Sequence, residues 1–335
     1  MCGEEKVGFS EVLYPLARSA LKRIVATLKQ FPFIFYLLGL VLLLIWFVAP
    51  GFYQPRPLLS FLKRSAPIII VTMGQAIVIL NGEIDLSVGS LITVCAVAAA
   101  KIIDNTSGNE GTAFFWIFAI SIIVGLVNGI VTTRLRVPSF VTTLGMLLIL
   151  QGAISIWTKG APKGGITPEF RYFGNASIGS IPVAVILLVI VVIVVTVLIE
   201  RTTFGRRVYA VGGNQVAARI SGVRPDVIKT TSFLLCSVLG AIGAVLVAGF
   251  SGVSTLTVGQ GYEFQAIAAA VLGGISLAGG RGKVAHAAIG ALTLQALFSL
   301  LNFLSLPISI RETAEGIIVI TAMAISAFRN ERTIS

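Results

Sequence analysis

Polar side chains interrupt the apolar runs of this chain at few positions, and these residues are the best suited to bind a solute. We single out Asp85, Ser87, Gln151, Gln265 and Asn302. Because a buried polar group is costly in lipid, such side chains usually face the interior of a helix bundle. Amides and hydroxyls there can hydrogen-bond a hydroxylated solute, or they can link neighbouring helices. We therefore predict that these five residues line a translocation path or a gate, with interhelical linkage as the alternative.

Two carboxylates, Glu83 and Asp85, are the only candidates for a proton site near the middle of the membrane. A proton-coupled carrier would need such a group. The alternative is that Asp85 caps a helix that begins near Ser87, because Asp-Leu-Ser stands where a helix N-terminus is expected. We prefer the capping interpretation.

Motifs of common catalytic and cofactor sites are absent from the sequence. Gly282-Lys283-Val284 lacks the upstream glycine of a phosphate-binding loop, and Gly212-Gly213 opens no strand–turn–helix unit. The three cysteines stand at unrelated places and His286 is the sole histidine, so neither a disulfide framework nor a metal site is expected. The chain is therefore predicted to have no cofactor, no metal and no enzymatic activity, ATP hydrolysis included.

The composition is that of an integral membrane protein. Of 335 residues, 56% are hydrophobic and only 12% are charged, against roughly 25% charged residues in soluble domains. The net charge of +11 lies in short loops beside apolar runs, without interleaved aromatic residues, so nucleic acid is not an expected partner. We expect an all-α polytopic membrane protein in contact with membrane lipid.

Ten apolar runs give a prediction of about ten transmembrane helices within a single domain of residues 31–328. A cytoplasmic amphipathic arm of residues 1–30 precedes this domain, and a cytoplasmic tail of residues 329–335 follows it. Two of the runs, Ser139–Trp157 and Phe264–Leu277, are short or polar enough to be broken or re-entrant. The runs are Phe33–Val48, Ala66–Leu80, Ser87–Ile103, Ala113–Val131, Ser139–Trp157, Ile181–Ile199, Ile228–Ala248, Phe264–Leu277, Val284–Phe303 and Thr313–Phe328.

The basic residues predict the orientation of these spans. With the N-terminus inside, the inner segments hold 17 of the 25 lysines and arginines. This asymmetry predicts that both termini and the loop of residues 200–226 are cytoplasmic. Residues 50–65 fit less well, since they carry Arg56, Lys63 and Arg64 and yet fall outside.

The stretch Glu200–Asp226 is the longest polar interruption in the chain, and it carries five arginines. Within it, residues 216–220 are predicted to form a short helix that Asn214 caps and that Gly222 and Pro225 end. Its alanines, Ala217 and Ala218, would let another surface approach closely. The alternative is a basic connecting loop that only fixes the topology.

Two glycine-rich stretches, Asn81–Ser90 and Leu272–Gly282, each follow one apolar run and lead into the next. Matching glycine interruptions in two halves indicate an internal repeat and broken helices beside a transport path. The alternative is that the glycines serve only close helix packing.

Four motifs together resemble the permease subunit of ribose/xylose-type ABC sugar importers, over about residues 35–328. They are Gly82–Ser90, Ser139–Gly145, Gly205–Asn214 and Leu272–Gly282, in the order and spacing of the family. Two residues depart from the pattern: Glu83 replaces a small or neutral residue, and His286 replaces what is often glycine.

The resemblance implies a monosaccharide importer of the plasma (inner) membrane that works by alternating access. It implies a second permease copy (as a homodimer or a heterodimer), two cytoplasmic ATPase subunits and an extracytoplasmic sugar-binding protein. It also assigns ATPase coupling to the segment Gly205–Gly222. The residues assigned to coupling are Gly205, Arg206, Gly212, Gly213, Asn214, Ala217, Ala218 and Gly222.

The outer segment Lys159–Gly179 is a candidate landing surface for the binding protein, because long loops often carry recognition. Its basic residues Lys159, Lys163 and Arg171 would meet acidic groups on the partner. Two other classes of function remain open at this point: a proton-coupled sugar carrier that uses Glu83 and Asp85, and a membrane scaffold that transports nothing.

Overall fold

The structure is a computed structural model that describes residues 32–161, 164–252, 255–307, 310, 313, 314, 316, 317, 320 and 321. The predicted N-terminal arm, the C-terminal tail and most of the run Thr313–Phe328 lie outside the described residues.

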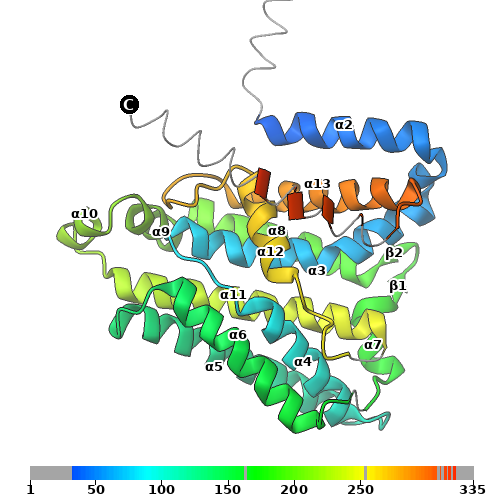
Figure 1. The fold of residues 1–335 in the computed structure, drawn as a ribbon, viewed down its shortest axis with the longest axis horizontal. Helices are drawn as coiled ribbons and strands as arrows, with labels where there is room; N and C mark the ends of the chain where they lie inside the picture. Colours follow the sequence, from blue (N-terminus) through cyan, green and yellow to red (C-terminus); the bar gives the residue numbers. More distant parts are fainter. Residues whose placement is uncertain are drawn as a thin grey trace, which may run out of the picture.

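The described part of the chain is almost entirely helical, as the composition predicts. Strands β1 (Ser177–Ile178) and β2 (Ile181–Pro182) form a small antiparallel hairpin between α7 and α8. The helices, shown in Figure 1, are α2 (Phe33–Val48), the 3₁₀ helix η1 (Pro50–Tyr53), α3 (Pro55–Leu80), α4 (Val88–Ile103), α5 (Glu110–Arg134), α6 (Ser139–Thr158), α7 (Pro168–Asn175), α8 (Val183–Arg201), α9 (Thr203–Gly213), α10 (Gln215–Ile220), α11 (Pro225–Ser251), α12 (Tyr262–Leu272) and α13 (Val284–Phe303).

Helices α3 and α11 form the centre of the bundle and run side by side (Figure 1). In their most apolar windows, 83% of α3 and 72% of α11 is buried. A helix that is apolar around its whole circumference can be enclosed in this way. The approach of α5 to α11 depends on two glycines: a Cβ at Gly125 would lie 2.8 Å from the Leu234 Cα, and one at Gly129 would lie 2.7 Å from the Thr230 Cα. Small residues four apart are typical of close helix packing in membranes.

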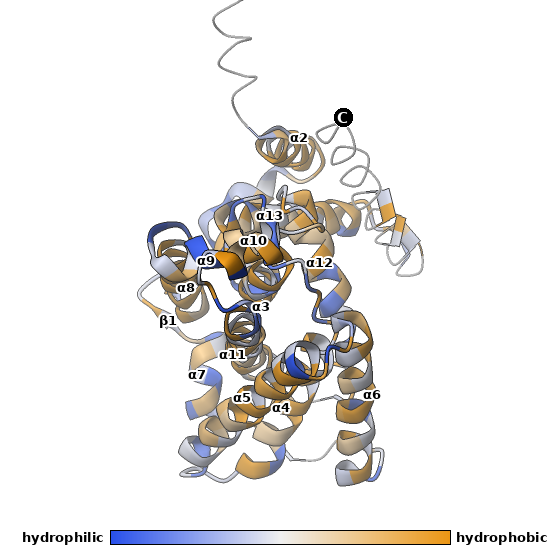
Figure 2. Cartoon of the chain, turned by 90° about the vertical axis from the view of Figure 1, so that its left-hand side faces the viewer, coloured by the Kyte–Doolittle hydropathy of each residue, from blue (hydrophilic) through white to orange (hydrophobic). Residues whose placement is uncertain are grey.

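Helices α5, α6 and α8 lie at the periphery. Only 33%, 22% and 33% of their apolar windows are buried, so their surfaces consist of large apolar side chains. Figure 2 shows these outer helices mostly in the hydrophobic colour. A hydrocarbon environment explains this surface, because a soluble protein rarely exposes large contiguous apolar patches.

Among the described residues, six helices are long and apolar enough to cross a membrane: α3, α5, α6, α8, α11 and α13. Helices α2, α4 and α12 are apolar but shorter. The run Phe264–Leu277 is broken, as expected, since α12 ends at Leu272. The prediction of a break in Ser139–Trp157 is wrong, because α6 runs without interruption for 20 residues.

Residues 55–65 also differ from the prediction, since they form the first part of α3 rather than a loop. The basic residues of this segment reduce its hydropathy but not its ability to form a helix. They extend α3 to 26 residues, about 39 Å at the usual rise of an α-helix.

Helix α11 separates two polar surfaces. It has 27 residues and is therefore about 40 Å long, enough to cross a hydrocarbon core of about 30 Å. Near its start Lys229 contacts Gln215 of α10, and near its end Gly249 and Phe250 pack against Gly174 of α7. Figure 1 accordingly shows α9 and α10 at one end of the molecule and α7 with the hairpin at the other.

Candidate translocation cavity and coupling surface

A polar cavity of 320 Å³ lies between α4, α6, α12 and the segment that precedes α12. Hydroxyl, amide and carboxylate side chains make up most of its wall. The lining residues are Ser90, Thr93, Gln151, Ile154, Ser155, Leu256, Thr257, Gln260 and Glu263. Small-molecule sites begin at about this volume, so the cavity fits a solute of monosaccharide size better than a larger molecule.

Close backbone contacts hold the segment of residues 255–261 against α4. The Thr93 hydroxyl accepts a hydrogen bond of 3.0 Å from the Gly259 N–H and donates one of 3.2 Å to the Gly89 carbonyl. A Cβ at Gly259 would lie 2.2 Å from the Gly89 carbonyl oxygen, so only glycine permits this approach. Thr93 therefore fixes one wall of the cavity while lining it.

Glu263 introduces a carboxylate into this wall at the first turn of α12. The residue is 5% exposed, and its Oε2 atom has no hydrogen-bond partner. No lysine or arginine among the described residues lies within ion-pair distance of it. A buried polar atom without a partner costs about 1–3 kcal/mol. One oxygen of this carboxylate is therefore unpaired within the described part of the chain.

Helix α12 carries Glu263 in its first turn, at the cavity. It ends at Leu272, next to the glycine-rich loop of residues 273–283 at the α9 end of the molecule.

The five predicted path residues do not form one site. Gln151 lines the cavity. Gln265 is half-buried on α12 but is not part of the lining, and Asn302 is exposed near the far end of α13. Asp85 and Ser87 are buried in a separate hydrogen-bond network and do not line this cavity.

That network connects the loop after α3 to α5. Asp85 Oδ1 accepts hydrogen bonds from the Ser87 N–H at 2.9 Å and the Ser87 hydroxyl at 2.6 Å, and Asn128 donates to the Ser87 hydroxyl at 2.9 Å. With its amide oriented to satisfy both groups, Gln75 bonds the backbone N–H and carbonyl of Asp85, each at 3.1 Å. Asp85 thus holds the turn that leads into α4. It does not cap the helix as predicted, because Ser87 occupies the N-cap position and the hydrogen bonds of the Asp85 side chain go to Ser87.

The coupling segment packs against both glycine-rich loops. A Cβ at Gly212 would lie 1.8 Å from the Leu80 carbonyl oxygen and 2.7 Å from the Gly280 N atom. The Gly280 N–H donates to the same Leu80 carbonyl at 2.9 Å, and the Tyr209 hydroxyl donates to the Gly282 carbonyl at 2.8 Å. The two similar stretches of sequence therefore meet at the C-terminal end of α9.

The predicted short helix of the coupling segment is confirmed as α10. The Asn214 side chain accepts 3.0 Å hydrogen bonds from the Val216 and Ala217 N–H groups. Gly222 follows the helix with a φ of +82°, a conformation that glycine adopts without strain. Gly212 and Gly213 are helical. The expectation that Ala218 lets another surface approach is wrong, because Ala218 is buried in the core of its own chain.

The outward surface of α10 is apolar, and its side chains are larger than those of the predicted alanine face. Val216 is 70% exposed and Ile220 is 83% exposed, while Ala217 lies exposed between them. Arg206 of α9 and Arg219 of α10 are also exposed. Figure 2 views the molecule from this end. Gly205 lies inside the segment, where a Cβ would lie 1.7 Å from the Ile199 carbonyl oxygen.

Lys229 connects α10 to the loop after α3. Its ammonium group forms a 2.6 Å ion pair with Glu83 and a 3.0 Å hydrogen bond with the Gln215 side chain. The side chains of Lys229 and Glu83 are only 13% and 14% exposed. Glu83 therefore has a structural partner, which argues against its use as a free proton site.

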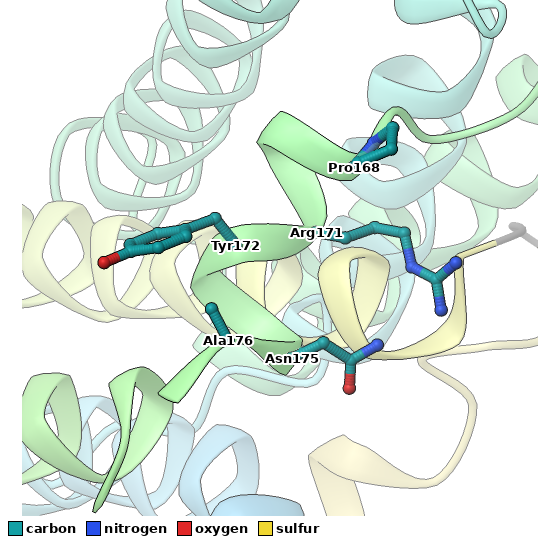
Figure 3. A pocket seen from close by; sticks show the side chains of 5 residues that line it. All are labelled: Pro168, Arg171, Tyr172, Asn175 and Ala176. Atoms are coloured by element: carbon teal, nitrogen blue, oxygen red, sulfur yellow. The ribbon is translucent and has the colours of Figure 1, made fainter. Parts of the chain in front are cut away.

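The opposite end of the molecule carries basic residues around α7. Arg171 and Asn175 line a hollow of 370 Å³, and Figure 3 shows both side chains on the side of α7 away from Tyr172. Lys63 donates to Asn175 at 2.7 Å and shares a neighbouring cavity with Arg64. Within the described residues, Lys63, Arg64 and Arg171 have no carboxylate partner. Lys163 lies outside the described residues.

Three functional candidates were missed by sequence reasoning. Glu263 stands one residue before an apolar run, where a buried carboxylate is unusual, and that position was a usable signal. The other two are the pairing of Lys229 with Glu83 and the outward direction of Val216. Both depend on tertiary contacts, so no local sequence pattern predicts them.

Residues 58–325 match the family model described as "Branched-chain amino acid transport system / permease component". The chain is 33% identical to the ribose import permease protein RbsC of Escherichia coli strain K12, over 83% of this chain and 88% of the relative. It is 32% identical to RbsC of Bacillus subtilis strain 168, over 85% and 89%. It is also 33% identical to the autoinducer 2 import system permease protein LsrC of Escherichia coli O9:H4 (strain HS), over 86% and 84%. No solved structure matches the chain.

Proposed function

The chain belongs to the family of permease components of branched-chain amino acid transport systems, and from this membership we propose how its sites work. It is the membrane-spanning permease subunit of an ABC sugar importer and is not an enzyme. Separate ATPase subunits hydrolyse ATP, and a substrate-binding protein delivers the solute. This assignment is preferred over a proton-coupled carrier and over a scaffold that transports nothing.

The segment of α9 and α10 is proposed to couple ATP hydrolysis to transport. The observation that supports this best is the contact of α9 with the region where the two glycine-rich loops meet. Because Gly212 touches Leu80, the last residue of α3, and Gly280 at once, a displacement of α9 would act on the start of one loop and on the other loop directly. One loop leads into α4 and the other follows α12, and these helices carry the wall of the cavity. ATP-driven motion of a docked ATPase would thereby change access to the cavity, as alternating access requires.

The solute that we propose is a monosaccharide of the ribose or xylose type. Two of the relatives are ribose import permeases by name. The cavity wall has the amides and hydroxyls that hydrogen-bond a neutral hydroxylated solute, and its 320 Å³ suits one sugar ring.

A second permease copy is proposed to complete the path along α6. Gln151 and Ser155 line the cavity and are nevertheless exposed on the α6 surface of the single chain. Polar residues at such a position require a protein or water neighbour rather than lipid. Gly145 and Gly152 on the same helix have free space beside them, which would permit the close approach of another helix.

The membrane orientation that we propose puts the α9–α10 end and both termini in the cytoplasm of a plasma (inner) membrane protein. The excess of basic residues on that side supports it. The α7 end then faces the binding protein.

Reconstitution of the permease with its cognate ATPase and binding protein in lipid vesicles tests this function. We expect ATP-dependent uptake of D-ribose or D-xylose that needs all three components, and no uptake of L-leucine. Uptake of L-leucine in preference to both sugars would contradict the substrate class. Uptake driven by a pH gradient without the ATPase would contradict the mechanism.

A further inference from the structure

A buried carboxylate lines the permease cavity, and one of its oxygens has no partner among the residues that the structure describes. Glu263 lines the cavity at 5% exposure, and its Oε2 atom has no hydrogen-bond partner. The carboxylate lies beside Gly89, where an added Cβ would lie 1.8 Å from Oε2. A site that selected only by size would not need a charge at this position.

We propose that Glu263 is a sugar-binding residue of the permease itself, which accepts a hydrogen bond from a hydroxyl of the transported solute. This inference rests on the proposed function, and it adds a recognition step inside the membrane to the selection made by the binding protein. The remaining polar groups of the wall, including Gln151, Ser90 and Gln260, contact the other hydroxyls.

The chemistry of the wall favours a neutral polyol over a cation. Among the described residues of the lining, Glu263 is the sole carboxylate. Donors and acceptors are supplied by Ser90, Thr93, Gln151, Ser155, Thr257 and Gln260. A hydroxylated solute uses both kinds of bond, since each hydroxyl donates once and accepts as well. A cation would use only the acceptors and would leave the amide donors unpaired.

Sugar binding to the purified permease alone, in detergent or nanodiscs, tests the proposal. The probes are D-ribose, D-xylose and 2-deoxy-D-ribose, and binding is measured by calorimetry and by the shift in Tm. The variant Glu263→Gln keeps the shape of the side chain and removes its charge. The matched control is Asp104→Asn, the same exchange at an exposed carboxylate outside the cavity.

We expect wild-type permease and Asp104→Asn to bind D-ribose or D-xylose equally. Because a hydrogen bond to a charged group is stronger than one to a neutral group, Glu263→Gln should weaken this binding by about tenfold or more. Equal binding by Glu263→Gln at an unchanged Tm, or no binding of either sugar to wild-type permease, would overturn the proposal.

Uptake by the complete reconstituted importer separates this inference from the proposed function. Sugar uptake that Glu263→Gln leaves unchanged would overturn the role of Glu263 and leave the function standing. Absence of sugar uptake by the wild type would overturn the substrate class of the proposed function instead. Loss of uptake in Glu263→Gln, with wild-type uptake normal and ATPase assembly intact, would support both the role of Glu263 and the proposed function.

Discussion

At the residue scale, Lys229 joins three segments that are far apart in the sequence. Its ammonium group contacts Glu83 in the loop after α3 and Gln215 in α10, while its backbone belongs to α11. The ion pair is mostly shielded from water. Removal of one member of a buried pair leaves an uncompensated charge, which typically costs about 3–5 kcal/mol.

We therefore predict that Glu83→Gln and Lys229→Met each lower Tm and reduce uptake. The double variant should be less damaged than the sum of the single variants, because no charge is left unpaired. The exposed pair Arg219–Asp226, at 3.6 Å, gives the control: Asp226→Asn should have little effect, as surface pairs contribute little. Strictly additive losses of Tm in the double variant would show that the two charges do not interact.

At the element scale, α10 presents an apolar face that no described residue of the chain covers. Val216 and Ile220 are four residues apart on this short helix, so they share one side of it. Ala218 faces inward, which means that a bulky residue there would disturb the packing of α10 itself. The exposed pair is the sharper probe of ATPase docking.

The variant Val216→Asp with Ile220→Asp should abolish co-purification of the ATPase while leaving the Tm of the isolated permease unchanged. Charges on this face would have to be desolvated in an apolar contact, which is costly. Leu135→Asp is a matched control, since Leu135 is 68% exposed in another loop at the same end. Normal assembly of the double variant would place the docking surface elsewhere.

At the scale of the whole molecule, α11 keeps two working surfaces at opposite ends. The cations around α7 have no carboxylate partner among the described residues and suit an acidic surface on the binding protein. Arg171→Glu should weaken docking of the binding protein, most strongly at low salt, where screening is least. Arg136→Glu, at the other end, should leave docking unchanged. Equal effects of the two variants would indicate a change in net charge rather than a docking site.

Much of this architecture could be predicted from the sequence, because apolar runs define membrane helices almost directly. The runs Phe33–Val48 and Val284–Phe303 agree with α2 and α13 residue for residue. The cap at Asn214 was predictable as well, since capping depends on neighbouring residues alone.

Other features depend on contacts between distant residues and could not be predicted. The helicity of Gly212 and Gly213 follows from the packing of α9 on two loops rather than from a local turn. Asp85 and Glu263 are both carboxylates beside apolar runs, yet only Glu263 lies in the cavity wall. The packing of the helices determines which of the two carboxylates lines the cavity, and a single sequence does not specify that packing.

The contact of α9 with both loops is the centre of the proposed mechanism, and adjacent glycines test it most directly. A Cβ at Gly212 would lie 1.8 Å from the Leu80 carbonyl oxygen, whereas a Cβ at Gly213 would meet no atom within 4 Å. Both residues are helical, so Gly212→Ala and Gly213→Ala change helix propensity alike.

The measurement is sugar uptake together with ATP hydrolysis by the reconstituted importer. We expect Gly213→Ala to behave as the wild type. Gly212→Ala should still assemble with the ATPase but should lose most of the uptake, together with the response of ATP hydrolysis to loaded binding protein. Wild-type uptake by Gly212→Ala would contradict the claim that α9 moves the two loops.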